Sequence, residues 1–143
     1  MKNTKAIGLS VLCSATVLAG CSSSKGVSST CSATFQGVKT QIVLQAEKED
    51  AAVDSLRYIE TVPKSDLLEY GETENDLQDE IQDEIEEYQE NYGVSKSAIS
   101  YKVGDQDVTF TIQLSVEEFI GSNAPVYFDY LIDGLEGQGY YCD

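Results

Sequence analysis

The tetrapeptide LAGC at positions 18–21 marks a predicted cleavage point in this 143-residue chain. Only the residues after that point would remain to form a domain. Lys2 and Lys5 precede an apolar run over 6–17, which at about a dozen residues is too short to span about 30 Å of hydrocarbon as a permanent helix. A positive start, a short apolar run and small residues before a cleavage point form the pattern of a secretory signal. Residues 1–20 are therefore predicted to be removed on export.

The LAGC tetrapeptide also resembles the bacterial lipobox, in which a peptidase cuts before the cysteine and the thiol carries a diacylglycerol. Two acyl chains give a stable anchor where one chain would be marginal, and palmitate is an expected component. We therefore expect a lipoprotein signal peptide over 1–20. Cys21 would be the lipidated first residue, holding the chain in the lipid bilayer of the cell membrane on its extracytoplasmic side. A plain signal peptide and a buried helix ending in Cys21 remain alternatives.

The remaining cysteines follow from that assignment. Cys13 leaves with the signal peptide, so the exported chain keeps Cys31 and Cys142 besides the anchor. Outside the cytoplasm such a pair is best interpreted as a disulfide. Two free thiols and a redox pair are the alternatives, although redox pairs usually lie close in sequence. We predict a Ser-rich tether over 21–30 and a single domain over 31–143.

Alternation of apolar and polar residues predicts strands with one buried face. The alternating segments are 38–46, 53–62, 99–103 and 108–114. A shorter strand containing Phe35 comes first, joined to the second by a turn at Gln36-Gly37.

Helical spacing appears in two places. An apolar stripe recurs at Leu77, Ile81, Ile85, Tyr88 and Tyr92. Thr73 suits the N-cap of that helix and Gly93 its left-handed C-terminal position. Ser115 and Glu118 form a capping box for a short helical turn, and Pro125 is expected to open the last helix. The predicted fold is α+β, an antiparallel sheet in the order β-β-β-α-β-β-α with helices packed on one face.

The helix predicted over 73–92 is strongly acidic. Residues 72–90 contain ten acids and no base, in a chain whose net charge is −16. Such a surface repels nucleic acid and favours cationic partners or solubility alone. We interpret the helix as a candidate contact for a basic protein or a cation. Its candidate contact residues are Glu80, Asp83, Glu84 and Glu87.

Composition excludes several chemistries. The chain has no His and no Trp, and its one Met is Met1. Catalysis by Ser–His–Asp or Cys–His arrangements and His-based zinc sites are therefore excluded in their usual form. No Gly-rich phosphate loop follows a strand, and no acidic segment has the spacing of a calcium loop.

We therefore predict a non-enzymatic binding module without a cofactor or a defined metal site. The alternative is a lipoprotein that binds a small ligand or cation in a pocket between sheet and helices. Most of the nine tyrosines are expected at the core or its rim.

Several short motifs follow the lipobox in a recognisable order, namely CSATFQG, QAEKEDAAV, YGVSKS, VTFTIQL and LEGQGYYC. This layout resembles the YehR-like family of small bacterial lipoproteins, which carry a domain of unknown function. The resemblance covers nearly all of residues 21–143. It implies a membrane-anchored extracytoplasmic domain and supplies no substrate, cofactor or active site.

Overall fold

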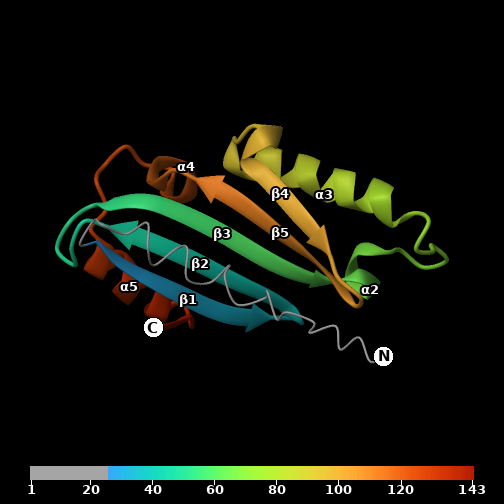
Figure 1. The fold of residues 1–143 in the computed structure, drawn as a ribbon, viewed down its shortest axis with the longest axis horizontal. Helices are drawn as coiled ribbons and strands as arrows, with labels where there is room; N and C mark the ends of the chain where they lie inside the picture. The colour runs from blue at the N-terminus through green and yellow to red at the C-terminus, as the bar shows by residue number, and fades with distance from the viewer. Residues whose placement is uncertain (1–25) are drawn as a thin grey trace, which may run out of the picture.

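The computed structural model describes residues 26–143, which form a six-stranded antiparallel sheet with four α-helices (Figure 1). The predicted signal peptide over 1–20 and the predicted lipidation site Cys21 lie outside the described residues. The strand order across the sheet is β4-β5-β3-β2-β1-β6. In chain order the elements are β1 (Val27–Phe35), β2 (Val38–Ala46), β3 (Val53–Pro63), α2 (Lys64–Leu67), α3 (Leu77–Tyr92), the 3-10 turn η2 (Lys96–Ala98), β4 (Ile99–Val103), β5 (Asp107–Leu114), α4 (Val116–Ile120), α5 (Phe128–Gly137) and β6 (Tyr141–Cys142).

One face of the sheet forms the core, and we call it the inner face. Its central row joins Ile42, Tyr58 and Ile112, which pair across β2, β3 and β5. Helix α5 lies against β1 and β2, while Tyr88 of α3 packs on Phe110 of β5 with ring centroids 5.4 Å apart (Figure 1). The two long helices therefore cover different parts of the same face.

The opposite face, which we call the outer face, is polar. One row across four strands consists of Lys39, Thr61, Thr109 and Lys102. The hydroxyls of Thr61 and Thr109 are hydrogen-bonded at 3.2 Å. Because successive side chains alternate between faces, this polar surface is the necessary counterpart of the apolar inner one.

Several local predictions are confirmed. Phe35 pairs with Val38 across the turn, where Gln36 and Gly37 take positive φ angles of 51° and 90°. Gly93 ends α3 in the left-handed region at φ 68°. Ser115 and Glu118 form both hydrogen bonds of the capping box that opens α4.

The N-terminal boundary of the domain was predicted wrongly. Strand β1 begins at Val27, so residues 27–30 pair with β2 and do not belong to the tether. Serine does not favour strands by itself, and Ser29 is buried in β1, so a Ser-rich composition concealed this extension.

Two helix starts also differ from the prediction. Helix α3 begins at Leu77, because the Asp76 carboxylate accepts hydrogen bonds from the amide and hydroxyl of Thr73 and holds 73–76 in a turn. Helix α5 begins at Phe128, three residues after Pro125. The carbonyl of Val126 accepts from the amide of Val53 at 2.9 Å, so this segment pairs with the chain before β3 instead of winding into a helix.

The predicted order lacked α2 and β6, and it also left out α4, which was expected only as a short helical turn at Ser115. Pro63 is the last residue of β3, and the single turn of α2 follows it and buries Leu67. Strand β6 has two residues, which pair with Cys31 and Ser32 of β1. Neither α2 nor β6 is long enough to show a periodic pattern in sequence.

Candidate functional site

Glu60 places a carboxylate on the inner face of the sheet. Strand β3 alternates so that Leu56, Tyr58, Glu60 and Val62 share that face, and Leu56 and Val62 are buried. A polar group among apolar neighbours requires a hydrogen-bond partner. The hydroxyl of Tyr88 on α3 supplies one, donating to Oε2 of Glu60 at 2.9 Å.

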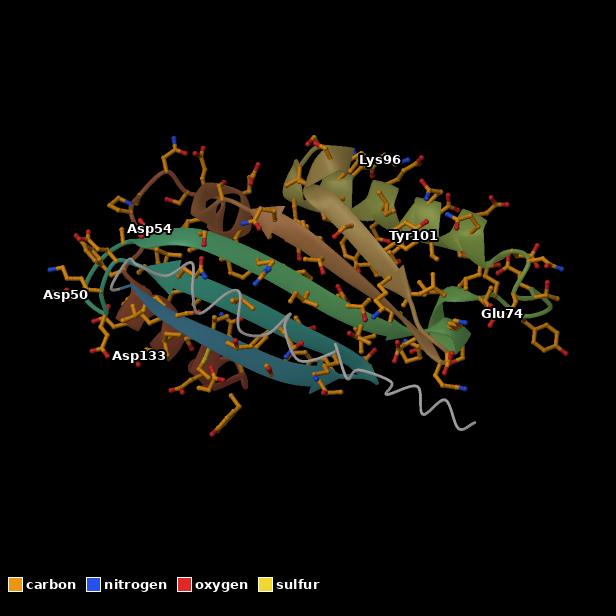
Figure 2. The ribbon with its side chains drawn as sticks, in the orientation of Figure 1. Asp50, Asp54, Glu74, Lys96, Tyr101 and Asp133 are labelled. Carbon is orange, nitrogen blue, oxygen red and sulfur yellow. A yellow bond between two sulfur atoms is a disulfide. The ribbon has the colours of Figure 1, made fainter. Side chains whose placement is uncertain are left out.

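No cation accompanies this carboxylate in the described part of the chain. The ion pairs within residues 26–143 are Lys48–Asp50 at 3.1 Å and Lys64–Glu74 at 3.0 Å. The ammonium group of Lys96 donates a hydrogen bond to the side-chain oxygen of Gln82 at 2.8 Å. Figure 2 shows Glu74 in the segment before α3 and Lys96 alongside the helix, away from Glu74. Glu60 thus has a hydrogen-bond donor but no counter-charge.

A cavity of about 550 Å³ opens beside Glu60. Its volume falls within the range of small-molecule sites, about 300–1,000 Å³. The turn after β1, the starts of β2 and α2, the middle of β3 and the segment before β6 each supply part of the wall. The lining residues are Phe35, Gln36, Val38, Thr40, Tyr58, Glu60, Asp66 and Tyr140.

Aromatic rings surround the cavity on two sides. Phe35 and Tyr140 meet edge to face with centroids 5.7 Å apart. Behind them, Tyr58 packs on Tyr92 of α3 at 5.6 Å, and Tyr92 stacks on Tyr88 at 6.5 Å. Phe35 and Tyr140 thus form one aromatic pair at the cavity, and Tyr58, Tyr92 and Tyr88 form a second group that reaches α3. The chain has no tryptophan.

The tyrosine hydroxyls near Glu60 stay protonated. Burial raises the pKa of Tyr58 far above its ordinary value, and the negative charge of Glu60 raises it further. Burial followed by the charges of Glu60 and Glu84 raises the pKa of Tyr88 in the same way. Burial also raises the pKa of Tyr92 and of Tyr140. These groups therefore act as neutral hydrogen-bond donors at physiological pH.

The disulfide positions one wall of the cavity. Cys31 of β1 and Cys142 of β6 are bonded, as predicted, and they pair directly in the sheet with Cα atoms 4.0 Å apart. Tyr140 lies two residues before Cys142, so the bond that fastens the C-terminus also holds this ring against Phe35.

The four acids predicted as partner contacts lie on one side of α3, since they follow the i, i+3, i+4, i+7 spacing. Asp83 and Glu87 are exposed, while Glu80 and Glu84 are half-buried on the flank of the helix. Burial raises the pKa of Glu80, and the charges of Glu72, Asp83 and Glu69 add to the effect.

Among the four predicted contact residues, Glu84 is the one that the structure brings near Glu60 and Tyr88. Burial raises the pKa of Glu84, and the charges of Glu87 and Glu60 raise it further, against an opposing hydrogen bond with Tyr88. Tyr88 thus lies between two carboxylates, one on the sheet and one on the helix. We call Glu60, Glu84 and the lining of the cavity the Glu60 site.

A scan of protein-family models, a search of curated proteins and a search of solved structures each find no match to this chain.

Within residues 26–143 no group of three or more His, Cys, Asp or Glu side chains is placed to hold a metal ion. The same residues contain no helix with the length and apolar character needed to cross a membrane.

Sequence reasoning missed Glu60, Tyr58 and Tyr140 as site residues. A signal for Glu60 was present, because the alternation of β3 places this acid on the same face as Leu56 and Val62. No comparable signal existed for Tyr140, whose place depends on the pairing of β6 with β1.

Proposed function

We propose that this chain is a membrane-anchored extracytoplasmic lipoprotein of the YehR-like kind. Its folded domain acts as a non-catalytic interaction module for a basic partner. The observation that carries the proposal is the acidic side of α3, on which Glu80, Asp83, Glu84 and Glu87 lie together without a base. Glu84 extends this negative surface to Glu60, which also lacks a counter-charge within residues 26–143.

Electrostatics favour a cationic partner at this surface. Repulsion from neighbouring acids contributes to the raised pKa values of Glu80 and Glu84, so keeping both side chains ionised is unfavourable in free energy. A bound cation would relieve that repulsion. Complementary charges also accelerate association, and the acceleration weakens as salt screens it.

The anchor would keep the module close to the bilayer. Cys21 lies six residues before the first residue of β1, and six extended residues reach about 20 Å at most. The diacylglycerol on Cys21 therefore restricts partners to those within reach of the membrane surface.

Capture from envelope extracts tests the interaction. The lipidated full-length protein is used as bait at low and at high salt, beside a variant carrying Glu80→Gln, Asp83→Asn, Glu84→Gln and Glu87→Gln. We expect a basic protein whose recovery falls steeply with salt and with these substitutions.

The matched control removes four exposed acids elsewhere, through Glu47→Gln, Glu49→Gln, Asp133→Asn and Glu136→Gln. Asp133 lies on α5, away from α3 (Figure 2). Recovery that is independent of salt, or that falls equally in both variants, rules the proposal out.

A further inference from the structure

We infer that the cavity beside Glu60 is a binding site for an alkylammonium group, the charge that a lysine side chain or a small amine carries. The inference rests on the proposed function in one respect, because both require a cationic ligand. It concerns the cavity that adjoins the acidic surface at Glu60, and none of the residues that line this cavity belongs to α3.

The first support is the charge of the cavity wall. Glu60 and Asp66 contribute two carboxylates, and no lysine or arginine is among the lining residues. The side chain of Glu60 also lies outside the ion pairs found in residues 26–143. A carboxylate on the helix-covered face of a sheet is costly unless it is paired. A cation entering from solvent would supply the missing charge.

The second support is the aromatic wall. Phe35, Tyr58 and Tyr140 line the same cavity as the two carboxylates. The face of an aromatic ring attracts a cation within about 6 Å of its centroid. Phe35 and Tyr140 meet at an interplanar angle of 67°, so their rings present differently oriented walls. Carboxylates among aromatic rings suit an organic cation.

The wall composition disfavours a divalent metal ion as the occupant. Calcium takes about six to eight oxygen ligands, whereas much of this wall is aromatic or aliphatic. No cluster of three or more ligating side chains occurs in residues 26–143. The apolar part of the wall, including Val38, instead suits the methylene stem of an alkylammonium ion.

The cavity is accessible from solvent. Phe35 is 48% exposed and stands next to the β1–β2 turn at Gln36 and Gly37. Tyr58 and Glu60 are only partly exposed and lie deeper, on β3. A ligand entering past Phe35 would reach the carboxylate with its charged end.

Tyrosine fluorescence provides the test, because the chain has no tryptophan to obscure it. Full-length lipidated protein in dodecyl maltoside is titrated with Nα-acetyl-lysine amide, butylammonium, Nα-acetyl-norleucine amide and calcium. We expect saturable changes with the two ammonium probes and none with the neutral norleucine analogue or with calcium. Tighter binding of the lysine probe indicates a protein side chain as the source, and tighter binding of butylammonium indicates a free amine.

Two variants identify the site. Glu60→Gln keeps an acceptor for Tyr88 but removes the charge, and we expect ammonium affinity to fall at least tenfold. Phe35→Val changes a half-exposed residue with little risk to folding and should weaken binding by removing one ring. Glu90→Gln, an exposed acid near the end of α3, is the control and should leave affinity unchanged.

Equal binding of the norleucine analogue, saturable binding of calcium at the same site, or unchanged ammonium affinity in Glu60→Gln overturns the inference. These results are independent of the capture experiment on α3. A salt-dependent partner together with an unresponsive Glu60→Gln variant would remove the ammonium site and leave the proposed function. Ammonium binding without a captured partner would support the ammonium site and remove the proposed function.

Discussion

The hydroxyl of Tyr88 donates to the carboxylate of Glu60 at 2.9 Å, joining α3 to the middle of β3. This contact bridges the helix that bears the acidic surface and the strand that lines the cavity. It leaves the negative charge of Glu60 without a cation in residues 26–143. Groups arranged for binding commonly reduce the stability of the fold that holds them.

Glu60→Gln is therefore expected to stabilise the unliganded protein at pH 7. Glutamine can still accept from Tyr88, while the repulsion with Glu84 and the burial of a charge are removed. We expect the free energy of unfolding to rise by about 0.5–1 kcal/mol, within the usual range for removing an unfavourable group. Urea denaturation checks the value against Glu90→Gln, and a loss of stability in Glu60→Gln alone would show that the charge supports the fold.

Alkaline pH should destabilise the protein from about pH 10 upward. The pKa values of Tyr58 and Tyr88 are raised in the folded state from the ordinary 10.0, so the unfolded chain loses these protons first as pH rises. Absorbance at 295 nm should show a delayed tyrosinate step. In Glu60→Gln that step should move to lower pH, because a charge that raises both pKa values is gone. A step at the same pH in both proteins would mean that Glu60 does not act on these hydroxyls.

Mild acid should stabilise the protein at low salt. The pKa values of Glu80 and Glu84 are raised from 4.5 in the folded state, so the native protein takes up protons before the unfolded chain as pH falls from 7. The pKa of Asp76 is lowered from 3.8 by its hydrogen bonds with Thr73, so its contribution is lost as pH falls through that value and below.

Thermal unfolding between pH 7 and pH 3 should therefore show a maximum between roughly 4 and 6. Added salt at pH 7 should raise the melting temperature by part of the same amount, because salt screens the repulsion between the acids. A melting temperature that falls steadily from pH 7 would contradict this assignment of the acids.

Loss of the disulfide should be costly. Cys31 and Cys142 are 111 residues apart, and closing a loop of that length is worth about 4–5 kcal/mol on the chain-entropy account. Cys31→Ala with Cys142→Ala should lower the denaturation midpoint accordingly. The same variant should bind ammonium probes more weakly, since Tyr140 is no longer held beside the cavity. Two alkylatable thiols in the exported wild-type protein would show that the bond does not form.

Cys21→Ser tests the anchor separately from the fold. The substitution removes the thiol that would receive the diacylglycerol, so we expect unprocessed precursor or release from the membrane fraction. Fractionation followed by mass spectrometry of the N-terminal peptide distinguishes these results. A normally processed protein that remains in the membrane would contradict the lipobox assignment.

Local patterns predicted those elements whose causes lie within a few residues. Alternation located β2 and β3, and the Ser115 capping box and Gly93 marked helix ends, because each depends on neighbouring backbone groups. Pro125 did not predict the start of α5 correctly, because the carbonyl of Val126 accepts a hydrogen bond from the amide of Val53. That competition comes from a segment more than seventy residues earlier in the chain.

The amino-acid sequence by itself determined the α+β class and the acidic character of α3, and it predicted the bond between Cys31 and Cys142 that the structure contains. Composition and periodicity act over short distances and do not require the fold to be known. Only the tertiary structure decided that Glu60, Tyr58 and Tyr140 line one cavity. Its wall is assembled when β6 pairs with β1 beside β2 and β3, and such long-range pairing depends on the packing of the whole sheet.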